Sequence, residues 1–372
     1  MLRSKFLIPF VFFLASLLLL FAPLPAPLAN MSTLGSQVYL ARVEEVLEEG
    51  LVTLGEVTQS YQLLRVRILE GPYQQVLMEI DYGRRQVRSD NILLRPGDRI
   101  LVSISKTPDN VIHAYFVEHV RTKALFWLGL AFVCAILWLS GWKGLRSLFS
   151  MGFSLLVIAR YIIPSILNGG DPLWVSISGS ALLLGVTLYL TYGWDRKTHA
   201  SVLGMLGVLL LAGLLSDLFL TLARLNGQGD ENALFLLQSL PGRINLRGLL
   251  LGGMLIGALG VLDDLVTTQA AAVFEIGEAN PALSWRELYR RAMRVGQDHV
   301  AATVNTLVLA YAGASLPMLL LFSLGGGNYL RLINYSFIAE EIVRTLVGSL
   351  ALTVAVPLTT LLAIWLRPKN QP

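Results

Sequence analysis

One stretch of the sequence carries residue types that could do chemistry inside a membrane. It is GMLIGALGVLDDLVTTQAAAVFEIGEANP (253–281), which begins as an apolar segment and then places Asp263 and Asp264 side by side, followed by Thr268 and Gln269. An ionised carboxylate at the centre of a bilayer costs roughly 2.5–3.5 kcal/mol on insertion scales, so it is seldom retained without a role or a partner. These side chains are therefore candidates for binding a proton, a cation or a small polar solute.

On a helix, the small and polar residues of this stretch fall on one face, at steps of three and four residues: Gly253, Gly257, Gly260, Asp264 and Thr268. The opposite face carries the aliphatic side chains of Leu255, Leu259, Leu262 and Val266. Small residues let membrane helices approach closely, so we expect the small-polar face to meet other helices or water and the aliphatic face to meet lipid. The three glycines, together with Gly348, are predicted to make helix-packing contacts.

Two polar clusters are expected at different depths of the bilayer. Asp264 lies about 16 residues, or about 24 Å, into its helix, and Asn305 lies about 12 Å from the near end of the next helix, so the two can meet. The inner cluster is predicted to hold the candidates for binding an ion or solute: Asp264, Thr268, Gln269, Asp298, Asn305 and Thr306.

The second group is an outer charge cluster of Glu340, Glu341 and Arg344, with Asp217 at a similar depth. Acids in the first turn of a helix also suit the helix dipole, and Asp217 could face the outer loops, so plain structural roles stay open.

The composition identifies the class of protein. The chain of 372 residues is 54% hydrophobic and only 15% charged, with a mean hydropathy of +0.62, which is typical of a polytopic membrane protein. A single cysteine excludes an intrachain disulfide, and the four histidines lack metal-ligand spacing. We expect no metal site, no cofactor and no nucleic-acid partner. An enzyme would have to be an intramembrane aspartyl protease built on Asp217 and Asp264.

The N-terminal third contains one soluble module. Residues 1–29 form a signal peptide or an uncleaved signal-anchor helix, and residues 34–121 follow as an extracytoplasmic domain. Five short segments that alternate apolar and polar residues, separated by Gly and Pro turns, predict a small all-β, OB-like barrel: 37–46, 64–71, 74–83, 98–107 and 111–119.

Residues 124–366 are predicted to form a seven-helix transmembrane domain, and residues 367–372 a cytoplasmic tail. Each segment is long enough to cross about 30 Å of hydrocarbon. The segments are 124–142, 149–168, 172–193, 200–224, 247–274, 297–324 and 337–366. Lys and Arg concentrate in the loops that would lie inside, which predicts a multi-pass protein of the bacterial cytoplasmic membrane with its β domain outside.

Two connections carry helical signals. Residues 226–245 include an apolar run that predicts a short surface helix. Residues 282–296 begin with a capping box of Ser284 and Glu287 and continue as a basic amphipathic helix against the inner leaflet. An ordinary positive-inside connector, or a regulated contact with lipid or a partner, would both fit this pattern.

Five ordered motifs resemble the YibE/F-like family of bacterial integral membrane proteins: WKGLRSLFS, GWDRKTHASVLGMLG, INLRGLLLGGMLIGALGVLDDLVTTQAAAVFEI, NPALSWRELYRRAMRVGQDHVAATVNTLVLAYAGASLP and AEEIVRTLVGSLALTVAVPLTT. The resemblance implies an extracytoplasmic domain ahead of about seven spans, and it supplies no biochemical activity. The family pattern falls on Gly257, Gly260, Asp264, Asn280, Pro281, Gly296, Asp298, Asn305, Thr306, Ser315, Leu316, Pro317, Glu340, Glu341, Arg344, Gly348, Ser349 and Pro357. The family is not expected to carry acids at Asp263 and Asp217.

The leading hypothesis is a secondary transporter or permease, with Asp264 as the proton or cation carrier and Arg344 as an outer gate or anion contact. The alternative is a non-transporting membrane module whose external β domain senses or scaffolds. Partners expected are the lipid bilayer and a small solute or ion, while a homo-oligomer or a membrane partner is left open.

Overall fold

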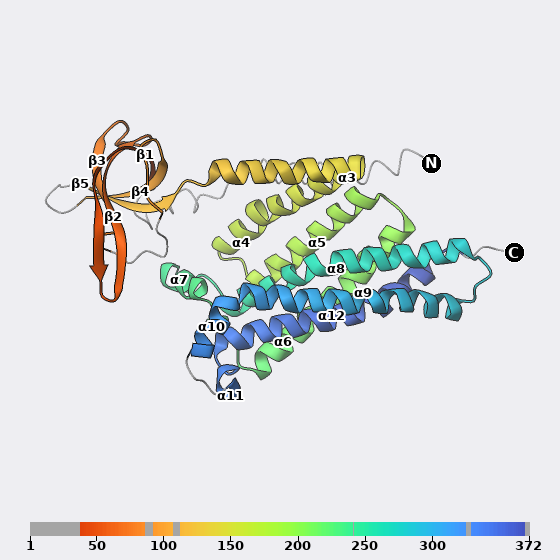
Figure 1. The fold of residues 1–372 in the computed structure, drawn as a ribbon. Coiled ribbons are helices and arrows are strands. Elements are labelled where there is room, and N and C mark those ends of the chain that lie inside the picture. The colour runs from red at the N-terminus through yellow and green to blue at the C-terminus, as the bar shows by residue number, and fades with distance from the viewer. Residues whose placement is uncertain (1–37, 86–91, 107–111, 241, 325–328, 369–372) are drawn as a thin grey trace. The chain divides into compact units, whose positions relative to one another are not determined.

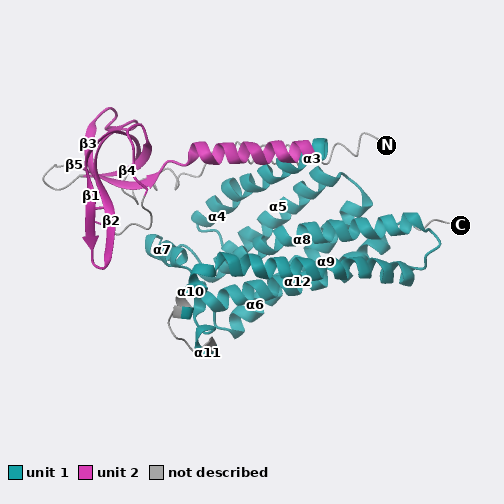
Figure 2. Ribbon diagram, viewed as in Figure 1, with its two compact units in different colours: residues 1–25, 140–372 teal, residues 26–139 magenta. Residues whose placement is uncertain are grey.

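The computed structural model describes residues 38–85, 92–106, 112–240, 242–324 and 329–368 (Figure 1). The predicted signal peptide or anchor at residues 1–29 lies outside these ranges. The chain divides into two compact units, residues 26–139 and residues 1–25 with 140–372, which are described separately (Figure 2).

The unit of residues 26–139, magenta in Figure 2, is built on one antiparallel sheet with the strand order β3-β2-β1-β4-β5. Its strands are β1 (Val38–Leu54), β2 (Val57–Ile68), β3 (Leu77–Tyr82), β4 (Arg99–Lys106) and β5 (Ile112–His119). The two end strands, β3 and β5, contact each other, so the sheet curls round on itself (Figure 1). The five predicted strands are all present among the described residues.

Strands β1 and β2 extend further than the sequence pattern predicts. They form one long hairpin, in which Leu54 pairs with Val57 across a turn that begins at Gly55. Gly55 has φ +63°, a conformation that glycine adopts at little cost. Most residues of β1 beyond Val46 are exposed or half-buried, so the hydrophobic alternation that locates strands is weak there.

The core of the sheet follows the predicted alternation. In β2, Leu64, Val66 and Ile68 are fully buried, whereas Arg65 and Arg67 between them are half-buried. The two arginines form ion pairs with glutamates of β1 on the other face. The unit therefore has its own hydrophobic interior and a charged outer face.

The unit that contains residues 140–372, teal in Figure 2, is helical. Its elements are the end of α3 (Thr122–Val157), η2 (Ile158–Ile162), α4 (Ile163–Leu167), α5 (Pro172–Tyr192), α6 (Arg196–Leu222), α7 (Glu231–Ser239), α8 (Leu246–Ala279), α9 (Trp285–Ala314), α10 (Leu316–Leu324), α11 (Tyr329–Leu332) and α12 (Ser336–Leu366). Helix α7 is the short helix expected within residues 226–245.

Five helical stretches are long and apolar enough to cross a membrane: Thr122–Leu167, Pro172–Tyr192, Arg196–Leu222, Leu246–Ala279 and Ser336–Leu366. The first of these covers two of the seven predicted spans. It is interrupted at Gly141, whose φ of 51° and ψ of −126° are not helical. The predicted connection at residues 143–148 is wrong, because these residues continue the helix and the break lies at Gly141.

The predicted sixth span, 297–324, is not a single helix. The basic segment expected at the membrane surface and the first part of the span form one continuous helix, α9, whose polar start keeps it out of the five apolar stretches. The helix ends at Ser315, where α10 begins with Pro317 as its second residue. Proline lacks a backbone N–H and fits the first turn of a helix, so a break falls naturally at this point.

Helices α8 and α12 form the centre of the helical unit. Helix α8 contacts α5, α6, α9 and α12, and α12 also contacts α6 and α9. Their interface is filled by fully buried side chains, among them Leu262, Val266, Ala351 and Val356. This central pair of helices positions the polar residues of α8 and its contacts with α9.

Candidate functional site

The aliphatic face of helix α8 is buried, contrary to the prediction, and its small-polar face is largely exposed. Gly253, Gly260, Asp264 and Thr268 are exposed, whereas the aliphatic residues Leu255, Leu262 and Val266 are buried. The reason is that α8 touches four other helices, and the interior of such a bundle is filled by close-packed aliphatic side chains. The expectation that the aliphatic face meets lipid is therefore wrong for the described chain.

Of the four glycines that were predicted to make helix-packing contacts, two have a neighbouring side chain and two do not. A Cβ added at Gly253 or Gly260 would meet no described atom within 4 Å, so these two make no packing contact within the described chain. A Cβ at Gly257 would lie 3.5 Å from Oη of Tyr311, and one at Gly348 would lie 3.4 Å from Cδ2 of Leu307, both ordinary contacts.

Closer helix approaches occur at other glycines, among them Gly296 and Gly204. A Cβ at Gly296 of α9 would lie 2.6 Å from Oε1 of Gln269, and one at Gly204 of α6 would lie 2.6 Å from Oγ1 of Thr359. A side chain at either position would force the neighbouring helix away. The family pattern includes Gly296, which was the available signal for this contact.

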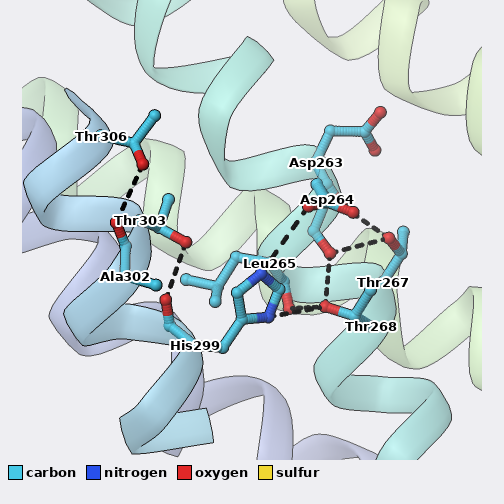
Figure 3. A network of polar contacts seen from close by, with 9 residues as sticks. All are labelled: Asp263, Asp264, Leu265, Thr267, Thr268, His299, Ala302, Thr303 and Thr306. Atoms are coloured by element: carbon cyan, nitrogen blue, oxygen red, sulfur yellow. Dashed lines mark hydrogen bonds and ion pairs between the residues drawn. The ribbon is translucent and has the colours of Figure 1, made fainter. Parts of the chain in front are cut away.

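Asp264 and His299 form the most chemically capable pair in the described membrane region (Figure 3). Oδ2 of Asp264 lies 3.7 Å from Nε2 of His299, and the Asp264 side chain is 77% exposed. Oγ1 of Thr268 lies 3.2 Å from Nδ1 of the same imidazole and donates its proton to the carbonyl of Asp264 at 2.7 Å. His299 was not among the predicted site residues. Its position inside the predicted span 297–324, one helical turn before Thr303, was the signal that could have indicated it.

Asp263 does not join this pair. Figure 3 shows its carboxylate directed away from His299. Its Oδ1 is buried without a hydrogen-bond partner among the described residues, and its carbonyl accepts a hydrogen bond of 2.8 Å from the Thr267 hydroxyl. The two neighbouring aspartates thus lie in different surroundings, as their positions about 100° apart on a helix require.

Gln269 does not join Asp264 in the predicted inner cluster; its side chain makes contacts between helices. The side chain is buried, and its Nε2 donates to the carbonyl of Ala292 at 3.1 Å and to Oγ1 of Thr360 at 2.7 Å. Thr360 in turn donates to the carbonyl of Val356. The amide therefore ties α8 to α9 and α12 at once, and we call this group the buried seam: Gln269, Ala292, Gly296, Val356 and Thr360.

The remaining inner candidates lie on α9 but do not reach Asp264. Asp298, Asn305 and Thr306 are exposed, and the Thr306 hydroxyl donates to the carbonyl of Ala302 at 3.0 Å. No contact of Asp298 or Asn305 with Asp264 is present in the described structure. At about 100° per residue, Asn305 points roughly 240° round the helix from His299, which is the residue that faces α8.

The outer charge cluster comes together at a cavity. Glu340 is buried and accepts a hydrogen bond of 3.2 Å from the backbone N–H of Gly229, while Nη1 of Arg344 lies 2.5 Å from Oε1 of Glu341. The three side chains line a cavity of about 550 Å³, together with the start of α7 and the junction of α9 and α10. Nε of Arg344 is buried without a described partner.

Asp217, expected near this cluster, has another partner. Its Oδ1 lies 2.8 Å from Nη2 of Arg247, at the beginning of α8. Arg247 and Asp264 are seventeen residues apart on one helix, or about 26 Å. The prediction that Asp217 joins Arg344 or could share a proton with Asp264 has no support in this geometry.

The start of α9 has the predicted cap. Oγ of Ser284 accepts a hydrogen bond of 3.3 Å from the N–H of Glu287. Glu287 forms ion pairs with Arg291 at 3.0 Å and Arg290 at 2.6 Å, and hydrogen bonds from these arginines lower the pKa of the Glu287 carboxyl. These contacts form a charged, exposed surface at the N-terminal end of α9, the helix that carries His299.

Comparison with known proteins assigns the helical part of the chain to a protein family. The family model described as YibE/F-like protein matches residues 128–369. No curated protein and no solved structure matches the chain.

Proposed function

We propose that this chain, which belongs to the YibE/F-like family, is a permease that carries a small solute or ion and exchanges a proton or cation at Asp264. The observation that supports the proposal is the 3.7 Å distance between Oδ2 of Asp264, on the apolar helix α8, and Nε2 of His299, on α9. Titratable groups paired in this way within spans are typical of proton and ion paths in pumps and transporters.

Thr268 determines how the pair can exchange a proton. Because its hydroxyl donates to the carbonyl of Asp264, its oxygen is free to accept from Nδ1–H of His299. A neutral imidazole in that tautomer presents an unprotonated Nε2 toward the carboxylate. A proton that arrives is then held between Asp264 and His299, and the imidazolium donates in both directions at once.

The exposure of Asp264 separates it from a structural acid. A carboxylate that only stabilises the fold would be enclosed by donors, as the buried seam encloses the amide of Gln269. The Asp264 side chain is instead 77% exposed, and Nε2 of His299 lies 3.7 Å from its carboxylate. A group that must load and release a proton or cation needs such access to water or solute.

One polar side chain of α9, Tyr311, lies between this pair and the outer charge cluster. Tyr311 of α9 lies within electrostatic range of Glu341 and Arg344, and its hydroxyl lies beside Gly257. From Gly257 to Asp264 is seven residues, or about 10 Å along α8. We assign Arg344 and the 550 Å³ cavity to the entrance, where the guanidinium would contact an anionic group of the solute or close the path.

The test is proton movement by the purified chain in proteoliposomes. A low-molecular-weight fraction of bacterial extract serves as the solute pool, and an internal pH dye reports flux under an imposed potential. Asp264→Asn is expected to lower the solute-dependent flux at least about tenfold. Glu275→Gln, an exposed acid on the same helix, is the matched control and is expected to retain it. Full flux in Asp264→Asn would exclude the proposal.

The β domain supports the second candidate function, a sensor or scaffold that does not transport. Its strand order, with β3 and β5 in contact at the two ends, fits an OB-like barrel. Deletion of residues 34–121 separates the two functions. A permease is expected to keep solute-dependent flux without the barrel, whereas a sensor loses its biological effect and is insensitive to Asp264→Asn.

The proposed location is the bacterial cytoplasmic membrane, with the β domain outside and the C-terminus in the cytoplasm. The support is the distribution of basic residues, including the arginines at the start of α9. Cysteine accessibility at the two ends of the chain tests it. Labelling of the C-terminus from the outside of intact cells would reverse the orientation.

A further inference from the structure

A second polar cavity lies in the β unit, where the sheet joins the first apolar helix. It has a volume of about 340 Å³ and is lined by the start of β4, the end of β5, the loop before β4 and the first residues of α3. Its charged and polar lining includes Asp98, Arg99, His119 and Lys123. None of these residues takes part in the proposed transport path.

The two cations of this cavity are uncommitted. Neither Arg99 nor Lys123 has an ion-pair partner among the described residues. By contrast, four other arginines of the same unit pair with glutamates at 3.3 Å or less: Arg65, Arg67, Arg84 and Arg121. Two unpaired cations that line one cavity make it suitable for an anion.

The other polar groups of the cavity are already occupied. Oδ2 of Asp98 accepts a hydrogen bond of 2.8 Å from the N–H of Arg95 in the turn before β4. Nε2 of His119 lies 3.0 Å from Oη of Tyr82, which holds the imidazole against the sheet. With Asp98 offsetting one of the two cations, the cavity has a net charge that suits a singly charged anion.

Exposed apolar side chains lie next in sequence to the residues that line this cavity. Ile92 and Leu93, in the loop before β4, are 54% and 38% exposed. Directly after Lys123, α3 exposes Leu125, Phe126 and Trp127. Aromatic residues at the beginning of a span are typical of the interface between lipid headgroups and hydrocarbon. The cavity therefore combines an anion-binding lining with surfaces that would contact acyl chains.

We propose that this cavity binds the phosphodiester group of a phospholipid. The Arg99 guanidinium would donate two hydrogen bonds to the phosphate oxygens, and the Lys123 ammonium would contribute the second charge. The acyl chains would extend along the exposed residues at the start of α3. A bound lipid would fix the β domain at the membrane surface independently of any solute in the transport path.

Lipid binding to the full chain tests the proposal. The purified protein is delipidated in detergent, titrated with phosphatidylglycerol and measured by native mass spectrometry. Arg99→Gln with Lys123→Gln is expected to weaken the tightest bound lipid about tenfold. Arg84→Gln with Arg85→Gln removes the same charge elsewhere on the β unit and is the matched control. Thermal unfolding of both double variants shows whether each is folded.

The outcomes decide between sources of the phosphate group. Loss of the tight lipid only in the cavity variant, with no competition from millimolar inorganic phosphate, supports the proposal. Equal weakening in both double variants means a general charge effect and overturns it. Displacement of the lipid by inorganic phosphate identifies a free-phosphate site and also overturns it. If the cavity variant is unfolded, Lys123→Gln alone is measured against Arg85→Gln by the same criteria.

Discussion

Helix α8 carries two polar regions that are held in opposite ways. In the buried seam, Gln269 is 2% exposed and its amide bonds to two other helices. Five residues earlier, Asp264 is mostly exposed and has one ion pair of 3.7 Å. The comparison separates polar groups that hold helices together from polar groups that remain available to a ligand.

The physical reason is the cost of an unsatisfied polar atom. A buried amide without partners would cost about 1–3 kcal/mol, so Gln269 persists at its position because Ala292 and Thr360 satisfy it. The Asp264 carboxylate is not enclosed by donors of the described chain, so it can change its partner. Substitutions in the buried seam should therefore change stability, and substitutions around Asp264 should change transport.

The largest loss of stability is expected for Gly296→Leu. Even a Cβ at this position would lie 2.6 Å from Oε1 of Gln269, so a larger side chain must push α9 away from α8. Overpacking of this kind costs about 1–3 kcal/mol, and more when backbone must move. Thermal unfolding in detergent measures the effect, with Gly313→Leu as control, because a Cβ at Gly313 meets no described atom within 4 Å. Equal stability of the two variants would contradict the close contact.

A smaller loss is expected for Gln269→Leu. The new side chain fills a similar volume but removes the donor that serves Ala292 and Thr360. Because the Thr360 hydroxyl still donates to the carbonyl of Val356, the expected cost is about 1–2 kcal/mol. Gln297→Leu, at an exposed position of α9, provides the baseline in the same unfolding assay. A variant as stable as this baseline would show that the amide bonds contribute nothing.

Much of the fold could be predicted from the sequence. The alternation of Val66 and Ile68 with charged residues located β2, and the apolar segments located the helices. Capping chemistry located the start of α9 at Ser284. Each of these signals is local, which is why a single sequence contains it.

The arrangement of the helices could not be predicted in the same way. The small-polar face of α8 was expected to meet other helices or water and the aliphatic face to meet lipid, but α8 has four neighbours and its aliphatic face fills the space between them. The partner of Asp264 was missed because a sequence does not give the angle around α9, and Asn305 lies about 240° round the helix and about 9 Å along it from His299. That angle is fixed by the Gly296 and Gln269 contact, which depends on residues far apart in the chain.

The smallest expected effect, Gly260→Ala, tests whether the exposed face of α8 is covered in the membrane. Alanine is favoured over glycine within a helix by about 1 kcal/mol, and a Cβ at Gly260 would meet no described atom within 4 Å. The variant should therefore unfold at a slightly higher temperature than the wild type. Gly204→Ala serves for comparison and should unfold lower, because its Cβ would lie 2.6 Å from Oγ1 of Thr359. If Gly260→Ala destabilised the protein in lipid but not in detergent, another chain would cover this face, and Asp264 would lie at an interface between chains instead of on an accessible path.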